Sequence, residues 1–163
     1  MTHGRDLVLL EREVGSTQVK EIFRTPSGNT SWIRVSPDGR LVGFVREEPD
    51  SKTSTFVVAT LSGGAPRTLF TAAGAYALDG QRWQWTPDSQ EVFVTKNVTA
   101  GREVWHLRLT GPARKLDIDG RQWGEGFAVH PDARQIAFVA QAGEPGAEVW
   151  ALENFLPARA AKR

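Results

Sequence analysis

The sequence has no cysteine, one methionine, one tyrosine and only three histidines among its 163 residues. The absence of cysteine excludes disulfides, thiolate catalysis and cysteine-ligated metal sites. It leaves the compartment undetermined, because an exported protein does not need disulfides. The histidines, His3, His106 and His130, have neither the spacing nor the neighbouring carboxylates of a metal site. We therefore expect no metal and no cofactor.

Long apolar runs and an excess of one charge are also missing. No stretch approaches the roughly 20 apolar residues of a membrane-spanning helix. The patch Leu7 to Leu10 is followed at once by charged residues, so we find no signal peptide and assign no localisation; the periplasm stays open for a fragment of an exported protein. Basic and acidic residues number 20 and 19, with one basic cluster in the tail 158–163. This balance predicts neither nucleic-acid binding nor membrane insertion.

Catalytic motifs are absent as well. The sequence contains no Gly-x-Ser-x-Gly elbow, and no Ser, His and Asp set follows a usual catalytic pattern. We expect no catalytic residues, and we predict that the chain is not an enzyme.

What the sequence does contain is a repeat. The run "VSPDGRLVGFV" returns as "WTPDSQEVFV" and "VHPDARQIAFV", with prolines at 37, 87 and 131 and intervals of 50 and 44 residues. Apolar residues alternate on both sides of each Pro-Asp pair, as Ile33, Val35, Val42 and Phe44 do in the first copy. Period-two alternation around a turn predicts a β-hairpin with one packed face. We interpret Asp38 as a turn former and not as a catalytic acid.

The repeat unit has the length and strand number of a propeller blade. A third apolar run follows each hairpin, as in "STFVVATL" and "REVWHLRL", and a short fourth segment follows the first two of these runs. Four short strands in 44 to 50 residues are typical of a β-propeller blade. We predict an all-β fold of about three and a half four-stranded antiparallel blades, in an open arc or in part of a larger propeller. The expected units are a half blade at 4–28, blades at 29–73 and 79–119, and a last blade at 123–157.

The repeat resembles the WD-like propeller repeat of the TolB family. In that family a Ser-Pro-Asp-Gly turn precedes an Ile-x-Phe strand, and a Gly-Gly turn precedes an Arg-x-Leu strand, as in "VSPDGRLVGFV" and "FVVATLSGGAPRTLF" here. Trp85 stands where the family often has tryptophan, whereas "VHPDARQIAFVA" departs at the glycine. The resemblance implies a propeller from about Gly4 to Pro157. It implies a periplasmic scaffold, a sensor domain of a bacterial kinase or transcription regulator, or the lid domain of a peptidase.

Three and a half blades are too few to close a ring, since known propellers have at least four. We expect the chain to be the C-terminal part of a longer propeller, because it starts in the middle of a blade and its ending resembles the end of bacterial proteins of this kind. The alternative is a homodimer that closes one ring through the exposed blade ends.

Function is expected at the strands that line the central channel and at their loops, where propellers usually bind partners. We predict a non-catalytic scaffold or recognition module for a protein or peptide partner. The alternative is an accessory or sensor propeller domain of a multidomain bacterial peptidase, kinase or transcription regulator. A sugar- or metal-binding propeller is a third hypothesis. The candidate partner-binding residues are Trp32, Arg34, Arg82, Gln84, Arg121, Trp123 and Glu125. Packing between blades is the competing explanation for these residues.

Overall fold

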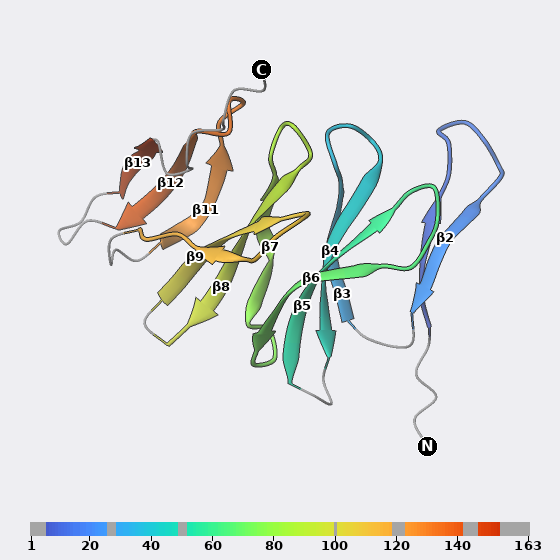
Figure 1. The fold of residues 1–163 in the computed structure, drawn as a ribbon, viewed down its shortest axis with the longest axis horizontal. Helices are drawn as coiled ribbons and strands as arrows, with labels where there is room; N and C mark the ends of the chain where they lie inside the picture. Colours follow the sequence, from blue (N-terminus) through green and yellow to red (C-terminus); the bar gives the residue numbers. More distant parts are fainter. Residues whose placement is uncertain are drawn as a thin grey trace.

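The fold is an open row of β-sheets. The structure is a computed structural model that describes residues 6–25, 29–48, 52–99, 101–118, 123–141 and 147–153. Throughout these residues the regular elements are strands, and every strand pair is antiparallel. Four sheets lie side by side in chain order, from the blue N-terminal pair to the orange and red C-terminal sheet (Figure 1). The predicted all-β fold of propeller sheets in an open arc is confirmed. Among the described residues there is no helix that could cross a membrane.

Within the described residues, the sheets have two, four, four and three strands in the order of the chain. The first sheet pairs β1 (Leu7–Glu11) with β2 (Lys20–Thr25). The second contains β3 (Asn29–Val35), β4 (Leu41–Glu48), β5 (Thr53–Thr60) and β6 (Arg67–Ala73). The third contains β7 (Leu78–Trp85), β8 (Glu91–Val98), β9 (Gly101–Arg108) and β10 (Arg114–Lys115). The fourth contains β11 (Trp123–Val129), β12 (Gln135–Gln141) and β13 (Ala147–Glu153).

The turn between β3 and β4 is built around the Asp38 carboxylate. Its Oδ1 accepts the Ser36 hydroxyl at 2.6 Å and the Arg40 N–H at 3.1 Å. The Leu41 N–H donates in turn to the Ser36 hydroxyl oxygen at 2.9 Å. The hydrogen bond from Ser36, followed by the bond from the Arg40 N–H, holds the pKa of Asp38 below its usual range. Asp38 is therefore an ionised turn former, as the sequence pattern predicts.

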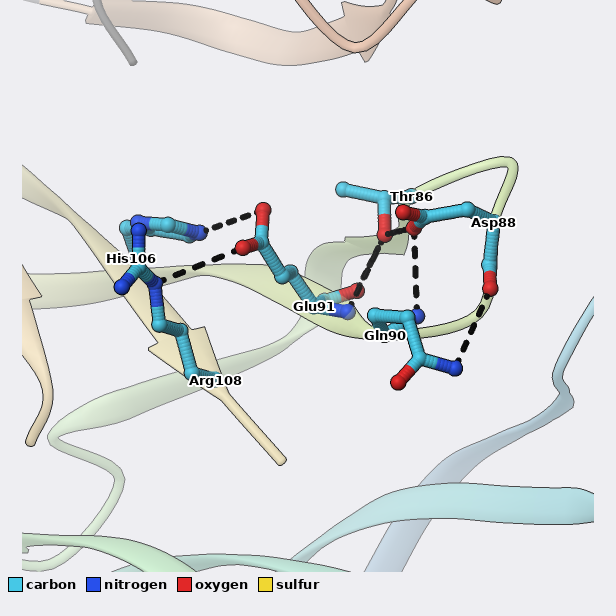
Figure 2. A network of polar contacts seen from close by, with 6 residues as sticks. All are labelled: Thr86, Asp88, Gln90, Glu91, His106 and Arg108. Atoms are coloured by element: carbon cyan, nitrogen blue, oxygen red, sulfur yellow. Dashed lines mark hydrogen bonds and ion pairs between the residues drawn. The ribbon is translucent and has the colours of Figure 1, made fainter. Parts of the chain in front are cut away.

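The next two hairpins repeat this turn with other residues. In the third sheet the Thr86 hydroxyl donates to Asp88 Oδ1 at 2.6 Å (Figure 2). In the fourth sheet His130 Nδ1 lies 2.9 Å from Asp132 Oδ1, and the Arg134 N–H donates to the same oxygen at 2.8 Å. The side chain before the proline thus changes from serine to threonine to histidine, while the aspartate keeps its role.

The residue after each aspartate has a left-handed backbone conformation. Its φ is +71° at Gly39, +61° at Ser89 and +58° at Ala133. Glycine adopts this conformation without steric cost, whereas a side chain is disfavoured in it. The Ser89 hydroxyl oxygen accepts the Asp38 N–H at 3.0 Å, so this serine also links the turns of two neighbouring sheets. Ser89 and Ala133 stand where the first repeat has Gly39, and the backbone of the turn is nevertheless the same in all three copies.

Apolar cores fill the spaces between neighbouring sheets. The core between the first and second sheets consists of Ile22, Phe23, Val42, Phe44, Val57 and Ala59. The core between the second and third sheets consists of Val45, Phe56, Val58, Ala72, Ala77, Leu78, Trp83, Trp85, Val92, Val94 and Leu107. The core between the third and fourth sheets consists of Phe93, Val104, Leu116, Ile136 and Phe138. Each sheet that has neighbours on both sides is therefore apolar on both faces.

The sequence predicts that the alternating apolar residues of the β3–β4 hairpin form one packed face. For the residues of β3 this prediction is wrong. Val35 is 51% exposed and Ile33 is 47% exposed, whereas their counterparts in the third sheet, Trp85 and Trp83, are 8% and 0% exposed. The cause is the size of the first sheet. In the part of the chain that the structure describes, it has two strands, which cover Val42 and Phe44 but leave β3 open.

Candidate functional site

Side chains of β7 connect the innermost strands of three successive sheets. Trp83 Nε1 donates to the carbonyl of Trp32 at 3.1 Å, and Trp85 Nε1 donates to the carbonyl of Arg34 at 3.1 Å. Both indoles are buried, and a buried indole N–H needs an acceptor. These two bonds fix β7 against β3.

Gln84 makes the corresponding connection to the fourth sheet. Its Nε2 donates to the carbonyl of Phe127 at 2.9 Å, and the Val129 N–H donates to its Oε1 at 2.9 Å. The side-chain amide thus bonds to β11 much as a peptide group of a neighbouring strand does. Gln84 has a structural role in the arc, in agreement with the packing explanation for this candidate residue.

Arg34 reaches from β3 to the backbone of β7. Its Nη1 donates to the carbonyl of Trp83, and its Nη2 donates to the carbonyl of Gln81 at 2.9 Å. The guanidinium carbon lies 5.1 Å from the centroid of the Trp83 ring. Partial burial lowers the pKa of Arg34, but a guanidinium stays protonated in proteins. Among the described side chains, no carboxylate forms an ion pair with Arg34.

Arg82, the other basic candidate, does have an acidic partner. Its Nη1 forms an ion pair with the Asp79 carboxylate, which also accepts the Gln81 N–H at 3.0 Å. The Arg82 Nε is buried and finds no acceptor in the described part of the chain. Asp79 therefore neutralises Arg82, and the positive charge in this region belongs to Arg34.

These side chains border a hollow of about 280 Å³ at the inner edge of the arc. We call it the inner hollow, and it is lined by Arg34, Gln81, Arg82, Trp83, Gln84, Gly126 and Phe127. Its lining combines one unneutralised guanidinium with side-chain amides and backbone groups. Chemically it can bind an anion or a hydrogen-bond acceptor, and none of its described lining residues is a nucleophile or a general base.

The structure brings together three of the seven predicted residues, namely Arg34, Arg82 and Gln84. Trp32 is not among the lining residues, and its side chain is 54% exposed, so packing between sheets does not explain it. β11 contains Trp123 and Glu125, but their side chains are outside the described part of the chain, as is all of Arg121.

Sequence reasoning missed several members of the site. Gln81 and Gly126 belong to no motif that predicts binding, and the repeat predicts Phe127 only as an apolar strand position. Asp79 carries a signal that was available, because an acid three residues before Arg82 is a common ion-pair spacing.

A second polar cluster lies on β8 and β9, the two middle strands of the third sheet. His106 on β9 is 2% exposed, stacks on Phe93 with ring centroids 4.9 Å apart, and places Nε2 3.0 Å from Glu91 Oε2. Arg108 Nε lies 3.4 Å from the other Glu91 oxygen (Figure 2). Burial lowers the pKa of His106, and the nearby Glu91 opposes that shift. The imidazole is neutral and enclosed, so this cluster is a structural one.

The His106 cluster makes stability depend on pH. An unfolded histidine has a pKa near 6.5, and His106 has a lower pKa in the folded chain. As the pH falls through about 6.5, the unfolded chain binds a proton before the folded chain does, and stability is lost. We expect His106→Phe to flatten the pH dependence of the free energy of unfolding between pH 7.5 and 5, measured by urea denaturation. An unchanged dependence would contradict this assignment.

No group of three or more acidic or histidine side chains that could hold a metal occurs among the described residues.

Comparisons with known proteins identify the fold. No protein-family model matches the chain, and no curated protein matches it. The structure of TolB from Acinetobacter baumannii aligns with a TM-score of 0.66 at 15% identity, over 90% of this chain and 35% of TolB. The β-propeller domain of the Trilobed protease from Pyrococcus furiosus aligns with a TM-score of 0.60 at 18% identity, over 78% and 39%. An acylaminoacyl peptidase from Pyrococcus horikoshii aligns with a TM-score of 0.57 at 13% identity, over 78% and 24%.

The chain therefore spans 24% to 39% of the length of these three solved structures. At sequence identities this low, the structural similarity is evidence for the fold alone. The alignments show that the chain has a TolB-like β-propeller fold, and its described sheets form an open row that does not close into a ring.

Proposed function

We propose that this chain is a non-catalytic propeller module that recognises a protein or peptide partner through a carboxylate bound in the inner hollow. The observation that carries the proposal is Arg34. Two backbone carbonyls and the Trp83 ring hold its guanidinium in place, and no acid of the described chain neutralises it. A guanidinium that is already positioned binds a carboxylate with little further loss of side-chain entropy.

The size of the inner hollow favours one functional group of a larger partner. Pockets for complete small molecules usually have volumes of about 300 to 1,000 Å³ and mostly apolar walls. This hollow measures about 280 Å³ and is lined largely by polar groups. An acidic side chain or a chain terminus fits these dimensions, and the rest of the partner would lie over the rim of the propeller.

The module forms the C-terminal part of a longer propeller in this proposal. Two observations support a longer propeller. The first sheet has two described strands, and the chain covers less than half of each solved structure named above. The second candidate function is an accessory or sensor propeller of a multidomain bacterial peptidase, kinase or transcription regulator. The peptidases among the structural neighbours favour it.

Peptide titration tests the carboxylate proposal. Two series of matched peptides are titrated into the ¹⁵N-labelled chain. In one series the C-terminus is either free or amidated, and in the other one internal residue is either aspartate or asparagine. We expect the carboxylate peptides to shift the indole N–H signal of Trp83, and the neutral peptides to leave it unchanged. The two acidic series distinguish a chain terminus from an acidic side chain.

Arg34→Gln is expected to weaken this binding roughly 10- to 100-fold, because a charge-assisted hydrogen bond contributes about 1.5 to 3 kcal/mol. Arg40→Gln is the matched control, since Arg40 lies exposed in the turn between β3 and β4 and does not line the hollow. Equal binding of neutral and acidic peptides, or unchanged affinity in Arg34→Gln, would overturn the proposal.

A further inference from the structure

Asp79 and Arg82 form an ion pair that a regular strand would not allow. Side chains three positions apart on a regular strand point to opposite faces of the sheet. β7 is irregular here, because its residues 79–82 lie between two register pairs that enclose a single residue of β8, Thr95. Within this bulge the Asp79 carboxylate accepts the Gln81 N–H at 3.0 Å and forms the ion pair with Arg82 Nη1. The bulge therefore brings the acid and the base together.

The repeat does not require this ion pair. Asp79 and Arg82 stand eight and five positions before the proline of their copy. The other two copies have neither an acid nor a base at these positions, where the first has Asn29 and Trp32 and the last has Trp123 and Gly126. The ion pair is thus a property of the third sheet alone, at the place where the inner hollow lies.

The ion pair is largely buried. The Asp79 side chain is 11% exposed and the Arg82 side chain is 20% exposed. A charge buried to this extent is costly without a partner of opposite sign. Arg82 lines the inner hollow, and its buried Nε has no acceptor among the described residues. A residue of the hollow thus has a donor without an acceptor, while its charge is already balanced by Asp79.

The described lining of the hollow consequently carries one net positive charge. Arg34 contributes that charge, Asp79 balances Arg82, and the other described lining residues are uncharged. A carboxylate carries one negative charge, whereas a phosphorylated side chain carries about −1.5 to −2 at pH 7. Arg34 alone therefore balances a carboxylate. A phosphoryl group would leave negative charge unbalanced close to the Asp79 carboxylate.

We infer that Asp79 is the specificity-determining residue of the inner hollow: by balancing Arg82 it makes the hollow select a carboxylate over a phosphorylated side chain. The inference rests on the proposed function, because it names the class of anion that the same site accepts. A phosphoryl group could recruit Arg82 only by separating it from Asp79, which would leave a largely buried carboxylate without its partner. Removal of the Asp79 charge frees the Arg82 guanidinium. Two guanidinium groups in one hollow can then bind a phosphoryl group together.

Three peptides of one sequence test the inference, with aspartate, phosphoserine or asparagine at a single internal position. Each is titrated into the ¹⁵N-labelled chain at neutral pH, and the indole N–H signal of Trp83 reports binding. We expect the natural chain to bind the aspartate peptide more tightly than the phosphoserine peptide. In Asp79→Asn we expect the ratio of the two affinities to shift roughly tenfold or more toward phosphoserine, the effect of one charge-assisted hydrogen bond. The asparagine oxygen can still accept the Gln81 N–H, so the bulge keeps this hydrogen bond.

Two further variants separate charge from local structure. Asp79→Asn combined with Arg82→Gln removes both charges of the ion pair, so the ratio of affinities should return to that of the natural chain. Glu13→Gln removes an acid at an exposed position between β1 and β2 that does not line the hollow, and it should leave the ratio unchanged. A purely structural role of Asp79 would weaken the binding of both anions alike and would not change their ratio.

Two outcomes would overturn the inference while the proposed function stands. One is a phosphoserine peptide that binds the natural chain at least as tightly as the aspartate peptide does, and the other is an unchanged ratio in Asp79→Asn. The first outcome needs no variant, so it decides the question even if Asp79→Asn does not fold. Equal binding of the aspartate and asparagine peptides would instead overturn the proposed function, and this inference with it. The two failures are therefore distinguishable.

Discussion

Trp83→Ala is expected to lower the free energy of unfolding by about 3 to 5 kcal/mol, which is the range for removing a large buried aromatic ring. The Trp83 side chain is 0% exposed. It meets Phe56 edge-on, with centroids 4.9 Å apart, and Trp85 at 6.2 Å. Alanine would leave a cavity in the core between the second and third sheets. It would also remove the indole donor to Trp32 and the ring under the Arg34 guanidinium.

Trp32→Ala is the matched control, because the Trp32 side chain is 54% exposed and contributes only its carbonyl to the contact with Trp83. We expect this variant to change the free energy of unfolding by no more than about 0.5 kcal/mol. Urea denaturation followed by circular dichroism measures both variants, with unchanged m-values as the check on two-state behaviour. Similar losses in both variants would refute the assignment of Trp83 as the central contact between these sheets.

The features predicted from the sequence are those that a short segment determines by itself. Asp38 forms its turn with Ser36 and Arg40, within two residues on either side, and the same local set recurs at Asp88 and Asp132. Strand alternation is also local, because successive side chains of a strand alternate between faces. The repeat therefore predicted hairpins, strands and sheets that the structure contains.

The features that escaped prediction depend on what lies across a sheet interface. Val35 and Trp85 hold the same position in the repeat, yet one is exposed and the other buried, because only Trp85 has a complete sheet before it. Arg34 binds carbonyls of residues 47 and 49 positions away along the chain. The sequence of β3 alone predicts neither the hydrogen-bond partners of Arg34 nor the residues that line the inner hollow.

Gly43→Ala is expected to lower the free energy of unfolding by about 1 to 3 kcal/mol, the usual cost of overpacking a core. Gly43 interrupts the apolar run "LVGFV" in β4, where a side chain would normally be an advantage. An added Cβ would lie 3.0 Å from Phe56 Cζ, 3.0 Å from Trp83 Cη2 and 3.1 Å from Trp85 Cζ2. The residue is therefore small because two indoles from the next sheet occupy the space above it.

If the Trp83 ring limits the size of residue 43, the effects of substitutions at Gly43 and Trp83 on the free energy of unfolding are coupled. A position that tolerates larger residues poorly for an unrelated reason would show no such coupling. Trp83→Phe removes Trp83 Cη2, one of the two ring atoms that lie 3.0 Å from the added Cβ, so Gly43→Ala should cost less in the Trp83→Phe background than in the natural chain. We expect the double variant to be more stable than the sum of the single losses by at least about 0.5 kcal/mol. Strict additivity in urea denaturation would mean that the Trp83 ring does not limit the size of residue 43. The close packing of sheets through Gly43 would then need another cause.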